Sequence, residues 1–166
     1  MRMPDTLDSD TAATLVLLAV AQAAAGAVEG VSADSIEVVG SGLIALQARA
    51  LLGGRFGLST PLEQPRAIVD TTGDPEVIVD ATRRIAALGT VVLAGEGLGR
   101  KAEMNLYPDV HVRGLTLVGV RPASQDALSA ANNADDTLVA SCRDALVGVV
   151  AGTPLPRGAT WYRVSG

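Results

Sequence analysis

The sequence predicts an α/β domain in which helices flank a mostly parallel sheet. Three observations point to this fold class. Short runs of valine, isoleucine and leucine lie between glycine-rich turns, as in strands that are buried on both faces. These runs alternate with segments of helical periodicity, which favours parallel strand pairing. A turn at Gly40-Ser41-Gly42 joins the first predicted strand directly to a helix.

The chain reads as a single domain, residues 1–166, in three parts. The lead-in part, residues 1–34, contains an alanine-rich helix expected from Asp10 to Val28. The core covers residues 35–150, and residues 151–166 form a C-terminal tail. Because the core holds alternating strands and helices throughout, we expect one sheet rather than two separate units.

Turn and cap residues set the expected element boundaries. Asp74 is a typical N-cap and Pro75 suits the first helical position, while Gly89 is expected to close the same helix after Leu88. Phe56–Thr60 is a candidate short strand in a proline-bounded stretch. The expected strands are 35–39, 67–70, 90–94 and 115–120, the expected helices are 43–52, 75–88, 124–131 and 135–150, and residues 160–164 are expected to be extended.

Composition excludes several function classes. The 18 carboxylates outnumber the 13 lysines and arginines, and no basic cluster carries an aromatic platform, so we expect no nucleic-acid partner. The single cysteine, Cys142, excludes a disulfide framework and a cysteine-rich zinc site within one chain, and fits a cytoplasmic location. The apolar stretch Ala12–Val28 is alanine-rich and contains Gln22, so we expect a buried helix and not a membrane span.

The most informative motif is Gly40-x-Gly42-x-x-Ala45, which follows a strand and opens a helix. The first glycine makes the tight turn, and the second lets backbone approach a pyrophosphate. The small third residue lets the helix pack closely on the strand. In this setting the motif predicts a Rossmann-type dinucleotide-binding fold, with the anion at the helix N-terminus.

Five segments extend the motif to a longer resemblance. In chain order they are Pro4–Ala25, Ile36–Gly53, Ala67–Glu76, Gly89–Gly95 and Leu106–Gly119. Together they resemble the cofactor-binding domain of the medium-chain (zinc-type alcohol) dehydrogenases, in the order of that family. The third segment is similar to the family's V-I-D-x-T-G-x-P-E run, and the last to its L-Y-x-x-H-x-R-G-L-T-V-x-G run. The match covers roughly residues 4 to 150.

The resemblance implies a cofactor crevice at the carboxyl ends of the strands, where NAD(P) would bind. The positions that it assigns to cofactor binding are Gly40, Ser41, Gly42, Leu43, Ile44, Thr71, Thr72, Gly73 and Gly95. The family's N-terminal GroES-like catalytic domain has no counterpart here, and its cysteine and histidine zinc ligands are missing with it. We therefore expect no zinc and no other metal site.

One departure from the family bears on cofactor affinity. The chain passes from Gly54 to Ala67 in a dozen residues, where the family has a strand, a helix and another strand. A direct crossover to the strand at Ala67 can take the disfavoured hand, so we expect Phe56–Thr60 to remain as a short or extended edge segment. The acidic residue that would hold the adenosine ribose has no clear counterpart, and Ser59, Thr60 and Glu63 are the nearest candidates. We expect NAD(P) binding to be weak or lost.

Three residues are weak candidates for catalysis. Asp70 ends a strand beside the expected crevice, and Glu96 lies in a glycine-rich loop that follows the next strand. His111 is the only histidine and could serve as a general base, although a structural role suits its position before a strand. Capping and solvation are the alternative explanations for the two carboxylates.

These features favour a truncated dehydrogenase-like protein that acts as a non-catalytic binding or partner subunit, in a biosynthetic pathway. A rival is an NAD(P)-dependent oxidoreductase, or a repurposed enzyme, whose substrate site is supplied by a partner chain. A third reading is a purely structural partner of another enzyme. The apolar strand Leu115–Val120 would lie at the sheet edge and pair with its mate in a homodimer, unless the C-terminal tail covers it.

Overall fold

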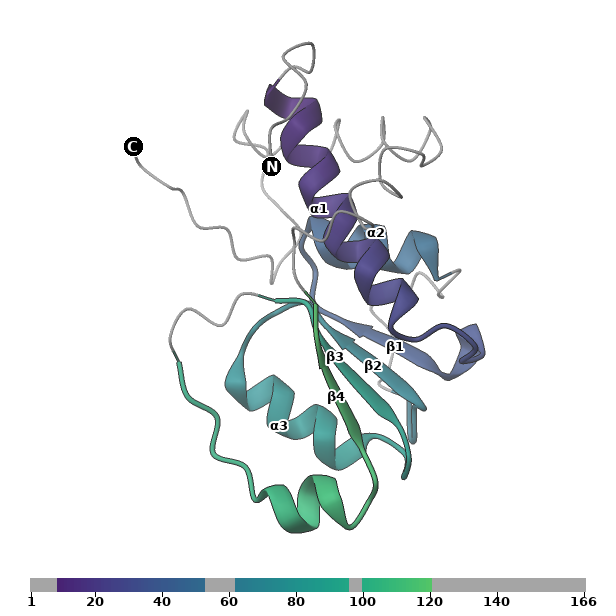
Figure 1. The fold of residues 1–166 in the computed structure, drawn as a ribbon, viewed down its shortest axis with the longest axis vertical. Helices are drawn as coiled ribbons and strands as arrows, with labels where there is room; N and C mark the ends of the chain where they lie inside the picture. Colours follow the sequence, from purple (N-terminus) through teal and green to yellow (C-terminus); the bar gives the residue numbers. More distant parts are fainter. Residues whose placement is uncertain (1–8, 53–61, 96–99, 121–166) are drawn as a thin grey trace.

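A computed structural model describes residues 9–52, 62–95 and 100–120. Its centre is a parallel sheet of four strands in the order β1-β2-β3-β4 (Figure 1). The strands are β1 (Ile36–Val39), β2 (Ala67–Asp70), β3 (Thr90–Leu93) and β4 (Thr116–Gly119). Each pairs in simple register with the next, so that their first residues align across the sheet. The α/β class, the parallel pairing and the four predicted strands are thus confirmed, to within a residue at each end.

In the described part of the chain, three α-helices accompany the sheet: α1 (Ser9–Gly26), α2 (Leu43–Leu51) and α3 (Pro75–Arg84). Two short helical turns, η1 (Ala33–Ser35) and η2 (Tyr107–His111), precede β1 and β4. α1 ends at Gly26 and not at Val28, because the next residues form a tight turn in which Val28 N donates to Ala25 O at 3.2 Å.

The predicted end of α3 at Leu88 is wrong, since the helix ends at Arg84. Arg113, which lies just before β4, donates hydrogen bonds to the carbonyls of Thr82, Arg83 and Ile85. These hydrogen bonds hold the C-terminal end of α3 against the segment that precedes β4. Leu88 itself takes a positive φ of 61°, and its N–H donates to Arg113 O at 2.9 Å.

The two faces of the sheet have separate cores. On one face Val20 and Ala24 of α1, with Val28 just after it, pack with the odd-numbered residues Ala67 and Val69 of β2. α2 lies beside α1, and its Ile44 packs on the same cluster. On the other face Ala81 of α3 and Ile85, which follows its last residue, pack against Ile68 and Val91. Figure 1 shows α1 and α2 on one side of the sheet and α3 on the other.

This arrangement has a consequence for connection handedness. The steps from β1 to β2 and from β2 to β3 go across the sheet in the same direction, so connections of one hand would place α2 and α3 on the same face. The helices lie on opposite faces. Followed through their helices, the two connections therefore have opposite hands, although about 98% of such crossovers are right-handed. If the connection through α3 has the usual right hand, a right-handed connection through α2 would lead to a strand on the outer side of β1 and not to β2.

A half-buried ion pair ties β1 to the end of α3. Arg84 donates to both carboxylate oxygens of Glu37, at 2.8 and 3.0 Å, and its Nε donates to Asp80 at 2.7 Å. The Glu37 and Arg84 side chains are only 16% and 25% exposed. The hydrogen bonds that Arg84 donates to Glu37 raise the pKa of Arg84 above its already high ordinary value. Glu37 also accepts the N–H of Leu62 at 3.1 Å, which fixes the chain as it returns toward β2.

Several predicted elements lie outside the described residues: the segment Phe56–Thr60, the helices 124–131 and 135–150, and the tail from residue 151. Within the described part of the chain, no helix is both long enough and apolar enough to cross a membrane. The described segment 62–66 enters β2 through a backbone hydrogen bond from Arg66 N to Ser35 O.

Candidate functional site

Three short loops meet at the carboxyl ends of β1, β2 and β3. They carry Gly40–Gly42, Thr71–Gly73 and Gly95, which are the positions predicted for a cofactor crevice. The parallel register brings these loops to one edge of the sheet, because Val39, Asp70 and Leu93 are aligned partners at the strand ends. The structure therefore assembles all three predicted loops at the place where open α/β sheets bind ligands.

The β1 loop turns sharply at Gly40, whose φ is +118°. A Cβ at this position would overlap the Thr71 hydroxyl oxygen. That hydroxyl donates to Val39 O at 2.8 Å, and the Thr71 N–H donates to the same carbonyl at 3.0 Å. Glycine is thus required at the first motif position both for its backbone angle and for the close approach of the neighbouring loop.

The second and third motif positions have the geometry that the motif predicts. Gly42 is the N-cap of α2, and no described atom lies within 4 Å of where its Cβ would be. The N-terminus of α2 is therefore open at this point, and its first N–H groups have no acceptor within the helix. Ala45 is fully buried and lets α2 approach the rest of the fold. Leu43 is buried as well, and Ser41 and Ile44 are half-buried.

Asp70 is fully buried, and its carboxylate is closed onto its own loop. One oxygen accepts the N–H and hydroxyl of Thr72, at 3.0 and 2.6 Å, and the other accepts the N–H of Gly73 at 3.1 Å. Burial of a carboxylate demands such partners. The arrangement makes Asp70 the fixed centre of the β2 loop, and these contacts occupy the group that the sequence offered as a catalytic candidate.

The β3 loop packs directly on the β2 loop at Gly95. A Cβ there would overlap the Gly73 nitrogen and stand 2.6 Å from the Thr72 carbonyl carbon and 2.7 Å from the Thr71 carbonyl carbon. All three are backbone atoms. The two loops are consequently in close backbone contact at the carboxyl ends of β2 and β3.

Asp74 caps α3 as predicted, accepting the N–H of Glu76 at 2.9 Å. That hydrogen bond is the main cause that lowers the pKa of Asp74, and the nearby Arg100 guanidinium lowers it further. Arg100 Nη1 lies 3.1 Å from the second carboxylate oxygen in an exposed ion pair. Asp74 thus has a capping role, and Arg100 fixes the chain beyond β3 to the start of α3.

Arg49 contributes to this region, although the sequence motifs do not indicate it. It is the only charged residue of α2, and its guanidinium donates to Val38 O at 2.8 Å and to Gly40 O at 2.6 Å. These carbonyls point away from β2, because the alternate residue Val39 bonds to Thr71. Partial burial lowers the pKa of Arg49, yet a guanidinium remains charged at any physiological pH. Arg49 therefore caps the outer edge of β1. An isolated arginine in an otherwise uncharged helix is the sequence signal that could have indicated it.

The other catalytic candidates are not brought to the crevice by the described residues. His111 lies in η2, before β4, and so at the opposite end of the sheet, where its ring stacks on Tyr107 with centroids 5.1 Å apart. Glu96 lies outside the described residues. In the ranges that the structure covers, no three histidine, cysteine or acidic side chains are grouped as metal ligands would be.

No family model matches the sequence, and no curated protein matches it either. Solved structures do. A protein from Sinorhizobium meliloti 1021 assigned as a zinc-binding dehydrogenase, bound to NADP, has a TM-score of 0.60 at 21% identity, over 96% of this chain and 60% of its own. Acetophenone reductase from Geotrichum candidum with NAD has a TM-score of 0.60 at 14% identity, over 93% and 56%. 2R,3R-butanediol dehydrogenase from Bacillus subtilis has a TM-score of 0.60 at 16% identity, over 92% of this chain and 58% of its own.

The chain thus spans about three fifths of the length of these dehydrogenases. Identities of 14–21% support a shared fold. The described elements form a Rossmann-like parallel sheet with flanking helices. The chain therefore shares its fold with part of each of these dehydrogenases, and the resemblance predicted from the sequence is confirmed at the level of the fold.

Proposed function

We propose that this protein is a dehydrogenase-like binding subunit that has kept the phosphate-binding turn of its fold and lost most of its affinity for NAD(P). It acts in a biosynthetic pathway through what it binds, without oxidising or reducing a substrate itself. The observation that carries the proposal is the strand order: β2 follows β1 directly, and within the described residues no strand lies on the outer side of β1.

That outer side is where the fold holds the adenosine half of a dinucleotide, beyond the first strand. Here the carbonyls of Val38 and Gly40 on this edge accept hydrogen bonds from Arg49. The Arg49 side chain thus supplies the donors that the backbone of a neighbouring strand would supply. Among the described residues no strand offers a platform for the ribose-binding acid, so we expect the adenosine contacts to be lost.

The retained turn supports binding of a smaller anion. Gly42 leaves the N-terminus of α2 open, and a helix N-terminus with free N–H groups favours phosphate. The Arg49 guanidinium lies beside the same turn, bonded to Gly40 O, and adds a positive charge. In contrast, both carboxylate oxygens of Asp70 accept hydrogen bonds from its own loop, so this residue is not a free general base, and no other described residue of the three loops is acidic.

Titration with NAD, NADH, NADP and NADPH tests the proposal through thermal shift and calorimetry. At 1 mM ligand, a Kd of about 1 mM stabilises the fold by only about 0.4 kcal/mol, and a Kd of about 10 μM by about 2.7 kcal/mol. For a chain of this size these values correspond to melting shifts of about 1–2 °C and about 5–11 °C. We expect the smaller shift for all four cofactors, and a shift of several degrees with any of them would refute the proposed loss of affinity.

The alternative is an NAD(P)-dependent oxidoreductase completed by a second protein. This alternative is favoured by the space beside Gly42, where no described atom lies within 4 Å of an added Cβ. A partner chain could add the missing adenosine wall and a substrate site there. Co-purification from the native source, followed by a hydride-transfer assay on the complex, separates the two proposals. Cofactor turnover by the complex, and none by this chain alone, would support the oxidoreductase.

We also propose that β4 mediates a homodimer. Thr116, Leu117 and Gly119 of this strand are exposed, and among the described strands β4 pairs only with β3. An apolar edge strand with free backbone groups invites pairing with its mate across a two-fold axis. Light scattering after size exclusion should give a dimer, and Leu117→Lys should shift the mass toward the monomer. A monomeric wild-type protein at micromolar concentration would exclude this interface.

A further inference from the structure

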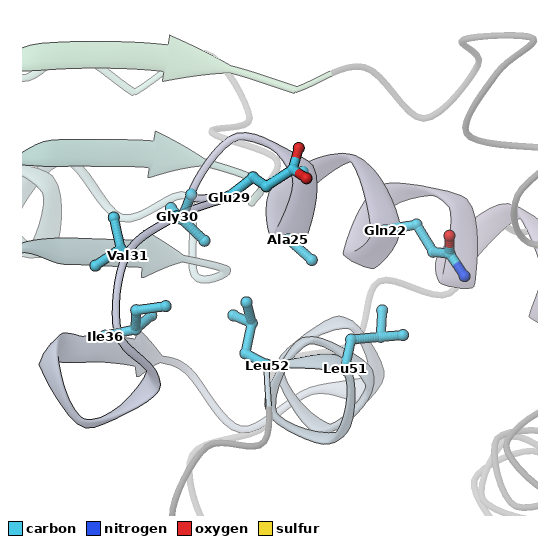
Figure 2. A pocket seen from close by; sticks show the side chains of 10 residues that line it. Gln22, Ala25, Glu29, Gly30, Val31, Ile36, Leu51 and Leu52 are labelled. Carbon is cyan, nitrogen blue, oxygen red and sulfur yellow. The ribbon is translucent and has the colours of Figure 1, made fainter.

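A pocket of about 440 Å³ lies at the end of the sheet opposite to the candidate crevice. It is an open pocket lined by the last turns of α1 and α2, the loop between α1 and β1, and the first residue of β1 (Figure 2). Its volume falls within the range of small-molecule sites. Its lining consists of Gln22, Ala25, Gly26, Val28, Glu29, Gly30, Val31, Ile36, Leu51 and Leu52.

The walls of the pocket are apolar and come from three separate elements. Leu51 and Leu52 rise from the end of α2 toward α1, as Figure 2 shows, and Val31 and Ile36 close the side next to β1. Ala25 on α1 leaves room between the two helices. Small and aliphatic side chains that surround such a space suit the hydrocarbon part of a ligand.

The charge and the helix dipoles at the pocket favour a positively charged ligand. The Glu29 carboxylate lies on the α1 side of the rim, and the amide of Gln22 adds a hydrogen-bonding group. Both α1 and α2 end at the pocket, so the negative ends of two helix dipoles face it. The last turn of α1 contains no basic residue, and Arg49, in the last turn of α2, is bonded to the β1 carbonyls instead. None of the ten described lining residues is basic.

From this combination we propose that the pocket binds a small organic amine: an aliphatic body between α1 and α2, with its ammonium group at Glu29 and the helix C-termini. The site is separate from the candidate crevice, because Ile36 begins β1 whereas the phosphate-binding turn follows its end. The inference therefore does not depend on the proposed loss of NAD(P) affinity. Either can fail while the other holds.

Titration of the full chain with hexylamine, hexanol and hexanoate, followed by two-dimensional amide NMR, tests the proposal. The three probes share a hydrocarbon chain and differ in charge. We expect hexylamine to bind tightest and hexanoate weakest, with shifts centred on Val31 and Leu51 and none at Gly40–Gly42. Removing the charge in Glu29→Gln should weaken hexylamine by about two- to fivefold, the range for an exposed ion pair, and leave hexanol unchanged.

Two further variants keep the test decisive. Ala25→Phe fills the space between α1 and α2 and should abolish binding of all three probes. Val16→Phe places the same side chain at an exposed site of α1, 38% accessible in the wild type, and should leave binding unchanged. Equal binding of hexanoate and hexylamine, an undiminished amine affinity in Glu29→Gln, or the absence of amine shifts at Val31 and Leu51 would each overturn the proposal.

Discussion

Replacing Gly95 by alanine is the sharpest test of how the crevice is built. The added Cβ would overlap the Gly73 nitrogen and come within 2.7 Å of two carbonyl carbons of the β2 loop. None of these atoms can rotate away, because they belong to backbone that Asp70 holds through its hydrogen bonds to Thr72 and Gly73. Relief requires the ends of β2 and β3 to move apart.

The expected loss of stability follows from this overlap. Inserting one methyl group into a packed site costs about 1–3 kcal/mol when neighbours can adjust, and the rigid backbone here places the value near the upper end, about 3 kcal/mol. The β2–β3 separation is also fixed by the hydrogen bond from Ala94 N to Asp70 O at 2.8 Å, one residue before Gly95. For a chain of this length we expect the melting temperature to fall by about 6–12 °C.

Circular-dichroism melting and urea denaturation measure the effect. Gly26→Ala is the matched control, because the added Cβ at the end of α1 meets no atom within 4 Å and alanine favours a helix. We expect that variant to match or slightly exceed the wild type in stability. A loss of less than about 0.5 kcal/mol in the free energy of unfolding of Gly95→Ala would refute the close packing of the β2 and β3 loops, since such a loss is typical of an ordinary surface substitution.

Three further substitutions test the parts around the crevice. Arg84→Met should lower the free energy of unfolding by about 1.5–3 kcal/mol in urea melts, because it leaves the mostly buried Glu37 carboxylate without its two charged hydrogen bonds, and little change would show that the ion pair does not hold β1 to α3. Gln47→Leu should raise the free energy of unfolding by about 1 kcal/mol and with it the melting temperature, because neither amide atom of this buried side chain has a partner among the described residues. A destabilised variant would point to a partner outside them. The lowered pKa of Asp74 means that its capping contribution is complete above the carboxylate's unfolded pKa of about 3.9 and is lost as the pH falls through the folded value. Asp74→Ala should therefore lose stability less steeply than the wild type between about pH 5 and pH 3, and parallel pH profiles would contradict the assignment.

The local signals in the sequence predict much of the fold. Runs such as Ala67–Asp70 and Thr90–Leu93 are strands because β-branched residues between turns suit a sheet that is covered on both faces. Asp74 caps α3 as predicted because the N-cap preference depends only on its neighbours along the chain. The Gly40–Ala45 turn is local too, since backbone angles and residue size decide it.

Features that depend on distant residues were not predictable in the same way. The residues up to Leu88 favour a helix by propensity, yet α3 ends at Arg84 because Arg113 takes its last carbonyls from a position nearly thirty residues away. The role of Asp70 could be predicted from the sequence only in part. Its spacing to Thr72 is typical of a side chain that closes on its own turn, but only the burial of the loop shows that no oxygen is left for a ligand.

Charged side chains make specific contacts with β1. A parallel strand at a sheet edge has carbonyls without backbone donors, and a chain that returns by an unusual crossover needs fixed contacts. Arg49 supplies donors for the outer carbonyls of β1, and the Glu37–Arg84 pair holds both the returning residue Leu62 and the end of α3. Arg49 thus supplies with its side chain the donors that a neighbouring strand would supply with its backbone. Because α2 and α3 lie on opposite faces of the sheet, α2 lies on the face from which a right-handed connection would lead to the outer side of β1.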